Sequence, residues 1–204
     1  MMLFRTAAAL VLAAGLVHAA PPTEKTGKPD DLPAPAAALS ATLVEIIPEP
    51  LTPAAFKPFG EVIEVPGGQA PTFENGVLRY WGGLAKDRFA EEVEFGMMSA
   101  AGRPREVAEL QRHARSSKFL VGLSGEWWLV VAPQTMAGRP LVASRVRAFL
   151  VKPGQAVLLH RGTWHADPFP KGDSGLFLVA VRDGTMKKDL KSRSFKGKEA
   201  VRIP

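Results

Sequence analysis

The sequence contains no cysteine among its 204 residues. This absence excludes disulfide bonds, thiolate ligands for metals and cysteine nucleophiles, so a hydrophobic core must hold the folded chain together. Aromatic residues make up only 8% of the chain, and we find no internal repeat, little helical periodicity and no nucleic-acid motif. A composition that is 46% hydrophobic and 23% charged is instead typical of a globular protein.

The N-terminal apolar run, residues 7–17, is shorter than the roughly 20 residues that a membrane-spanning helix needs. Arg5 precedes this run, and small residues at positions 17 and 19 follow it. The three-part pattern predicts a cleavable signal peptide over residues 1–19, and therefore export to the periplasm or secretion. An uncleaved anchor or a buried helix is the alternative. After cleavage we expect no association with a membrane.

The rest of the chain divides into three parts by composition. Residues 20–43 are rich in proline and alanine without apolar periodicity, which predicts a flexible linker. The folded domain is expected over residues 44–190. Residues 191–204 continue a run of lysines and arginines that contributes to the net charge of +6, and we interpret them as a solvated basic tail. Attraction to anionic surfaces or ligands is the alternative interpretation of these charges.

Within the domain, the pattern predicts a short helix followed by many short strands. The helix is expected at residues 51–56, with Thr52 as its N-cap and Pro53 at its first position. Short apolar segments, most of them bounded by glycine or proline, predict strands at residues 61–65, 77–81, 95–99, 107–113, 118–123, 126–132, 145–151, 156–160 and 176–182. Many short strands with such turns predict an all-β sandwich or barrel.

Residues 149–165 combine a Pro-Gly turn, an apolar strand and a second turn at Gly162 that leads to His165. This segment resembles the second signature motif of the cupins, because Gly154, Gly162 and His165 have the expected spacing. The resemblance implies an all-β, cupin-like barrel (a double-stranded β-helix or jelly roll) with a short N-terminal helix. His160, at the end of the strand, is interpreted as a turn residue.

Residues 111–125 resemble the first cupin motif, although two of its metal-binding positions carry other side chains. His113 fits, whereas Gln111 replaces a histidine and Lys118 replaces a glutamate. A divalent cation prefers imidazole and carboxylate ligands, and a protonated lysine repels it. We therefore expect no metal cofactor. A cationic Lys118 beside His113 and His165 is instead expected to bind a small anionic substrate, such as a carboxylate.

Several segments between residues 44 and 185 resemble the ureidoglycolate lyase family, also called ureidoglycolate hydrolase. These segments are residues 51–64, 75–80, 109–113, 130–133, 147–150 and 161–165. The resemblance implies a homodimeric cupin-like barrel that splits ureidoglycolate into glyoxylate and urea, within allantoin degradation and purine catabolism. The chain departs from the family at Gln111, Lys118 and Ala166, where the family has glutamate, glutamine and histidine.

Elimination of urea from such a carbinolamine needs a base for the hydroxyl proton and an acid for the departing nitrogen. The candidate residues are His113, His165 and Lys118 as catalytic residues, and Gln111, Arg79 and Asn75 as substrate-binding residues. We expect the two histidines to supply the acid and the base, and Lys118 with Arg79 to hold the carboxylate. Two alternatives stay open: an exported, non-catalytic cupin that binds a small carboxylate or sugar acid, and a metal-dependent cupin enzyme.

Overall fold

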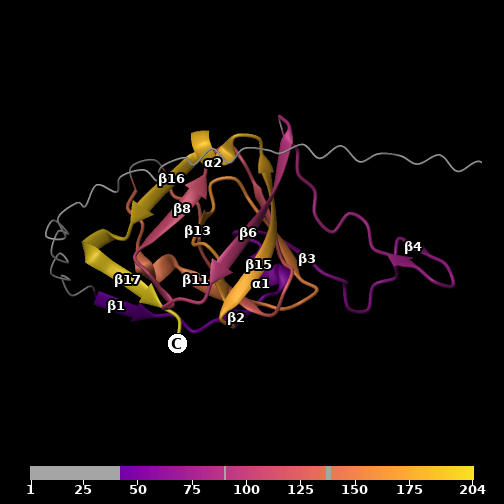
Figure 1. Ribbon diagram of the computed structural model, residues 1–204, viewed down its shortest axis with the longest axis horizontal. Helices are drawn as coiled ribbons and strands as arrows, with labels where there is room; N and C mark the ends of the chain where they lie inside the picture. Colours follow the sequence, from indigo (N-terminus) through magenta and orange to yellow (C-terminus); the bar gives the residue numbers. More distant parts are fainter. Residues whose placement is uncertain (1–41, 90, 137–138) are drawn as a thin grey trace, which may run out of the picture. The chain divides into compact units, whose positions relative to one another are not determined.

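Short β-strands supply most of the secondary structure in the computed structural model (Figure 1). The structure describes residues 42–89, 91–136 and 139–204. The predicted signal peptide and nearly all of the predicted linker lie outside these residues. Among the residues that are described, no helix has both the length and the apolar character needed to cross a membrane.

Two β-sheets form the barrel and enclose its core. The larger sheet has seven strands in the order β16-β8-β13-β10-β11-β2, with β14 also paired to β10. Its members are β2 (Glu49–Pro50), β8 (Glu109–His113), β10 (Trp127–Ala132), β11 (Arg147–Val151), β13 (Trp164–His165), β14 (Phe169–Pro170) and β16 (Leu190–Ser194). The other sheet has five strands in the order β3-β12-β9-β15-β6. Its members are β3 (Gly60–Ile63), β6 (Val93–Ala101), β9 (Lys118–Gly122), β12 (Ala156–Leu159) and β15 (Ser174–Arg182).

The remaining elements are smaller. A three-stranded sheet joins β1 (Thr42–Glu45), β17 (Glu199–Arg202) and β7 (Glu106–Val107), and β1 runs parallel to β17. A hairpin of β4 (Phe73–Glu74) and β5 (Arg79–Tyr80) forms a two-stranded sheet of its own and projects from the barrel (Figure 1). The helices are short: α1 (Pro53–Phe56), α2 (Thr185–Lys188), and 3₁₀ turns at Ala143–Arg145 and Lys196–Lys198.

Side chains from both large sheets meet in the barrel core. Leu120 and Phe177 of one sheet belong to the same buried cluster as Leu129 and Phe149 of the other. The ring of Phe56, from α1, packs edge-on against Phe149 with a centroid distance of 5.3 Å. A second buried cluster includes Leu110 and Trp164 of the larger sheet together with Val107 and Val201 of the three-stranded sheet. The all-β, cupin-like barrel predicted from the sequence is therefore confirmed.

The predicted N-terminal helix is present with the predicted cap. The Thr52 hydroxyl accepts a hydrogen bond from the amide of Ala55 at 3.2 Å, and Pro53 occupies the first turn. The strand predicted over residues 107–113 is interrupted at Ala108. It is interrupted because β7 pairs with β17 in the three-stranded sheet, whereas β8 pairs with β13 and β16 in the larger one.

Residues 191–204, which the lysine pattern predicts to be a tail, are part of the folded domain. Strand β16 pairs with β8 along its whole length, and β17 pairs with β1 and β7. The apolar side chains Phe195, Val201 and Ile203 are buried in the second cluster, between solvated lysines. Burial of these side chains stabilises the segment, which is therefore part of the folded domain instead of a free end.

Candidate active site

His113 and His165 lie side by side in the barrel, with ring centroids 5.2 Å apart. The antiparallel strands β8 and β13, which end at these residues, pair through Gln111 and His165. Alternation along β8 places Gln111 on the same face as His113. His165 also pairs with Val131, which belongs to the barrel core, so these polar side chains face inward. Both histidines are only 2% exposed.

The hydrogen bond at His165 shows which ring nitrogen can accept a proton. Its Nδ1 lies 3.1 Å from the carbonyl oxygen of Thr163. Because that oxygen can only accept, Nδ1 carries the hydrogen in the uncharged ring and Nε2 keeps its lone pair. Nε2 is buried and has no hydrogen-bond partner in the described part of the chain. Burial, reinforced by the charge of Lys118, holds the pKa of His165 well below 6.5.

His113 and Lys118 are also buried, which disfavours their charged forms. Burial first, and then the positive charge of Lys118, lowers the pKa of His113 to about 4, partly opposed by Asp189. Burial likewise lowers the pKa of Lys118 from 10.5, whereas the carboxylate of Asp167 acts in the opposite direction. Lys118 is 3% exposed and takes part in none of the ion pairs found among the described residues. The site therefore holds two uncharged imidazoles beside an unpaired amine.

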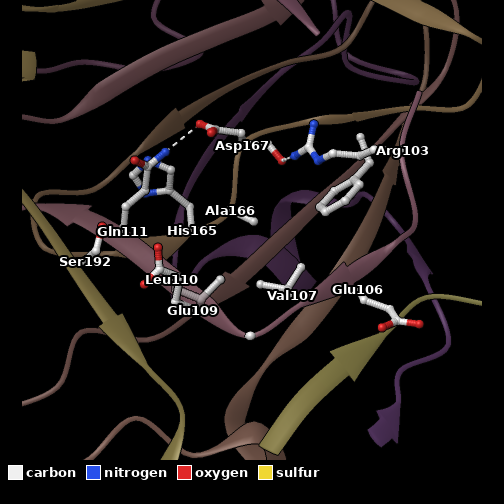
Figure 2. A pocket seen from close by; sticks show the side chains of 12 residues that line it. Arg103, Glu106, Val107, Glu109, Leu110, Gln111, His165, Ala166, Asp167 and Ser192 are labelled. Carbon is white, nitrogen blue, oxygen red and sulfur yellow. Dashed lines mark hydrogen bonds between the residues drawn. The ribbon is translucent and has the colours of Figure 1, made fainter. Parts of the chain in front are cut away.

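Asp167 belongs to this group of side chains, although the sequence analysis assigned it no role. The Gln111 side-chain amide donates a hydrogen bond to the Asp167 carboxylate, at 2.5 Å between Nε2 and Oδ1, drawn as the dashed line in Figure 2. The signal in the sequence is the spacing of two residues from His165, which places both side chains on one face of an extended segment.

A pocket of about 230 Å³ opens beside His165 and Gln111 (Figure 2). Its polar lining includes Arg103, Asp167 and Ser192. The guanidinium of Arg103 donates to the backbone carbonyl oxygens of Asp167 and Pro168, at 3.1 and 3.3 Å. Arg103 therefore supplies a cationic group to the pocket, although it lies outside both cupin-like motifs and its local sequence indicates no such role.

A second cavity, of about 260 Å³, lies next to Lys118. Asp167 lines this cavity as well as the first pocket, so its carboxylate stands at the boundary between the two. The other walls are mostly apolar and come from β6, β15 and α2: Glu94, Gly96, Met97, Met98, Val179, Val181 and Met186. The two spaces together form one candidate site, with a polar side at His165 and an apolar side at Lys118.

Arg79 and Asn75 are not brought to this site in the single chain. Both lie on the β4–β5 hairpin, where Arg79 forms an ion pair with Glu74 at 2.5 Å. The Asn75 side chain accepts hydrogen bonds from the amides of Val77 and Leu78, at 3.0 and 2.8 Å, and so stabilises the hairpin turn. In the single chain local contacts hold these two residues in the hairpin, and their role in binding substrate stays a prediction.

Cupin barrels commonly hold a divalent metal, so the donor groups here must be compared with what such a metal requires. No cluster of three or more histidine, aspartate or glutamate side chains suited to a metal occurs among the described residues. The two histidines face the amine of Lys118, and the Gln111 amide is already bonded to Asp167. An amine and an amide in place of carboxylate ligands do not fit a divalent metal site.

A small polar pocket in a β-barrel, with two uncharged imidazoles and a buried amine, is the kind of site found in barrel enzymes that act on small polar molecules. Residues 43–202 match the sequence model of the ureidoglycolate lyase family. The ureidoglycolate lyase of Chelativorans sp. (strain BNC1) is 37% identical over 145 residues, which cover 69% of this chain and 86% of the relative. That of Azotobacter vinelandii (strain DJ / ATCC BAA-1303) is 37% identical over 142 residues, covering 67% and 84%. The chain belongs to the ureidoglycolate lyase family.

Solved structures with partial similarity include oxalate decarboxylase from Bacillus subtilis and a sugar 3,4-ketoisomerase from Thermoanaerobacterium thermosaccharolyticum. The first is 15% identical with a TM-score of 0.34, covering 52% of this chain and 24% of that chain. The second is 10% identical with a TM-score of 0.36, covering 48% of this chain and 64% of that chain. Similarity at this level says nothing about the chemistry of the site.

Proposed function

We propose that this protein is a ureidoglycolate lyase, which releases urea and glyoxylate from ureidoglycolate. Membership of the family supports the reaction, and the observation that carries it in this chain is the buried, unpartnered Nε2 of His165 at the pocket. A lone pair in that position is a general base held ready for a substrate hydroxyl.

The substrate bears a hydroxyl, a carboxylate and a urea nitrogen on one carbon. His165 Nε2 accepts the hydroxyl proton, the carbon–nitrogen bond breaks, and the electron pair of the O–H bond forms the carbonyl of glyoxylate. The departing urea nitrogen takes its proton from the imidazolium formed at His165. The lowered pKa of His165 suits both steps, because the ring is uncharged before the reaction and its protonated form is a strong donor. His113, whose ring centroid lies 5.2 Å from that of His165, is a second uncharged imidazole at the site.

Two basic groups on either side of the pocket hold the substrate carboxylate, whose negative charge favours the protonated form of Lys118. Lys118 lies on the apolar side, and Arg103 lies on the polar side. The backbone carbonyl of Asp167 accepts from Arg103, and the Asp167 carboxylate, which accepts from Gln111, favours the charged form of Lys118 through space. Because the carboxylate is present in both substrate and product, this contact contributes to binding more than to the bond-breaking step.

We propose that the reaction needs no metal, because the donor groups beside the histidines do not suit one. The metal-dependent alternative is therefore not favoured. A non-catalytic cupin that binds a small carboxylate or sugar acid is also not favoured, since the curated relatives are lyases. The acid and base that the elimination needs are still supplied by His165, despite the departures from the family at Gln111 and Lys118.

The proposed cellular setting is export, because residues 1–19 have the pattern of a cleavable signal peptide. The mature protein then acts in the periplasm or after secretion, on ureidoglycolate formed in allantoin degradation, without nucleic-acid or membrane partners. Mass spectrometry of the N-terminus of protein from the exported fraction tests this: a start at residue 20 is expected, and an intact N-terminus contradicts it.

A homodimer is proposed from the exposed apolar side chains of an edge strand. Strand β6 ends the five-stranded sheet, and its residues Phe95 and Met97 are 71% and 58% exposed. Val77 on the β4–β5 hairpin is 98% exposed. Unpaired backbone groups and apolar side chains on an edge strand favour association with another chain. A second copy on β6 also covers the cavity of Lys118, because Met97 forms part of its wall.

The lyase reaction is tested with the full-length protein and ureidoglycolate, by measuring glyoxylate and urea separately. Equal yields of the two products are expected above the spontaneous rate. In His165→Gln, the amide cannot accept and return the proton, so the rate should fall by about 10²- to 10⁴-fold. The matched control is His160→Gln, an exposed turn histidine that lines neither cavity. Absence of product from folded wild-type protein would overturn the proposed function.

A further inference from the structure

The amine of Lys118 has an environment that the lyase reaction alone does not require. The side chain is 3% exposed and borders a cavity of about 260 Å³ with mostly apolar walls. Fully buried lysines are rare unless a carboxylate pairs with them. Here the described residues form no ion pair with Lys118, and Asp167 acts on it only through space.

The position of Lys118 in the fold aims the amine at the same space as the histidines. Lys118 begins β9 and pairs with Leu159 of β12 and Val181 of β15. Leu159 belongs to the barrel core, so the lysine side chain on the same face points inward. The positive charge of Lys118 is felt by both His113 and His165, which places the amine among the groups that handle protons.

We propose that Lys118 is a nucleophilic amine that forms a Schiff base with the carbonyl carbon of glyoxylate or another small 2-oxo acid. The inference rests on the proposed function, because glyoxylate is the product of the lyase reaction at this site. Apolar surroundings favour the uncharged amine of lysine. This form attacks carbonyl groups, because its nitrogen keeps its lone pair.

The reaction balances without an oxidant or a reductant. The lone pair of Nζ forms a bond to the aldehyde carbon, and the carbonyl oxygen takes a proton as the nitrogen loses one. The resulting carbinolamine then loses its hydroxyl group with one further proton from nitrogen, as water, to give the imine. Ureidoglycolate is itself the carbinolamine of glyoxylate and urea. The groups that cleave its carbon–nitrogen bond therefore suit the proton transfers of the lysine adduct.

A reversible adduct has a consequence for turnover. Glyoxylate that condenses with Lys118 stays in the cavity after urea has left, and a new substrate molecule cannot place its carboxylate there. We therefore expect glyoxylate to inhibit the enzyme reversibly, with a slow onset. Glycolate has a similar size and charge but no aldehyde group to condense with Lys118, so its inhibition should have no slow phase.

The test is trapping of the imine in the full-length protein. Glyoxylate and sodium cyanoborohydride at neutral pH reduce the imine to a stable carboxymethyl-lysine, which peptide mass mapping locates. Lys118 should be labelled faster than the exposed Lys191, because burial lowers the pKa of Lys118 and so increases its unprotonated fraction at neutral pH. Lys118→Gln should lose this label, and the matched control Lys191→Gln should keep it.

The outcomes separate the two proposals. Labelling of exposed lysines with Lys118 unmodified overturns the Schiff base, and this result needs only wild-type protein, even if Lys118→Gln does not fold. The trapping uses added glyoxylate, so it does not depend on the lyase reaction. Lyase activity without the adduct leaves the proposed function intact, whereas the adduct without lyase activity overturns the proposed function and supports the nucleophilic amine.

Discussion

Gln111 holds the carboxylate of Asp167 by a hydrogen bond of 2.5 Å, at the boundary between the polar pocket and the cavity of Lys118. This hydrogen bond links side chains from two neighbouring strands of the larger sheet, because Gln111 lies on β8 and Asp167 follows β13. The carboxylate raises the pKa of Lys118 against the effect of burial. Asp167 therefore regulates the charge of the amine without contacting it.

Substituting Asp167 tests this relationship. Asp167→Asn removes the negative charge and keeps the shape, so the pKa of Lys118 should fall further and more of the amine should be unprotonated at neutral pH. Reductive trapping with glyoxylate at Lys118 should become faster, by up to about tenfold for each unit of pKa. The control is Asp173→Asn, at an exposed turn that lines neither cavity. An unchanged or slower rate in Asp167→Asn contradicts the coupling.

The pH dependence of catalysis should lack the usual histidine inflection. Burial holds the pKa of His165 well below 6.5 and that of His113 at about 4, so both rings stay uncharged in mildly acidic solution. We expect kcat/KM to change little from pH 7 to about 5 and to fall only at lower pH. The measurement is a pH–rate profile corrected for spontaneous hydrolysis. A midpoint near 6.5 would show that the catalytic histidine is solvated.

The stability of the fold should decrease as the pH falls. His113 has a pKa of about 4 in the folded chain and about 6.5 when unfolded, so between these values only the unfolded chain binds the proton. The free energy of unfolding therefore falls by up to about 3 kcal/mol from pH 6.5 to 4 on account of this residue, and levels off below. His165 acts with the same sign.

Urea unfolding at several pH values measures this effect. The slope of stability against pH should be shallower in His113→Asn than in wild type, whereas the exposed His160→Asn should keep the wild-type slope. Comparing slopes instead of absolute stabilities removes the cost of repacking the substituted side chain. Equal slopes in all three proteins contradict the buried, uncharged state of His113.

A matched pair of glycines tests the close packing of β3 on β12. A Cβ atom at Gly60 would lie 2.2 Å from the backbone oxygen of Leu158, whereas one at Gly67 would meet nothing within 4 Å. Gly60→Ala should therefore reduce stability by about 3 kcal/mol, because backbone atoms must move apart. Gly67→Ala should be neutral or slightly stabilising. Thermal unfolding of both variants measures the difference, and similar melting temperatures contradict the close approach.

The proposed dimer surface is tested by placing a charge on β6. Phe95→Glu adds a carboxylate to an exposed apolar side chain and should shift the protein from dimer to monomer in sedimentation experiments. The control is Met136→Glu, at a side chain of comparable exposure, 77% against 71%, that lies outside β6. A wild-type monomer, or a dimer that tolerates Phe95→Glu, places the interface elsewhere or excludes it.

Strands that carry their own apolar pattern were predictable from the sequence. Strands β9, β10, β11 and β12 fall within the predicted ranges, because their side chains fill the barrel core. The two-residue strands β2, β13 and β14 were not predicted, since they exist only through pairing with β8, β10 or β11, far away in the chain. Local sequence holds no signal for a pairing of that kind.

The candidate site was likewise predictable from the sequence only in part. The two cupin-like motifs indicated His113, His165, Lys118 and Gln111, and the pairing of β8 with β13 brings three of these to adjacent positions. Arg79 was chosen for its resemblance to the family alone, and its ion pair with Glu74 keeps it in the hairpin. Arg103 gains its importance from contacts with Asp167 and Pro168 across the fold, for which its local sequence holds no signal, whereas Asp167 had only its spacing from His165 as a signal.

The parallel pairing of β1 with β17 has a consequence for how the protein is made. These strands come from opposite ends of the described residues, and Thr42 pairs with Glu199. A polypeptide that emerges N-terminus first from a ribosome or a translocation pore holds β1 without its neighbour until the final residues follow. Folding of this sheet therefore waits until β17 has been made and can pair with β1.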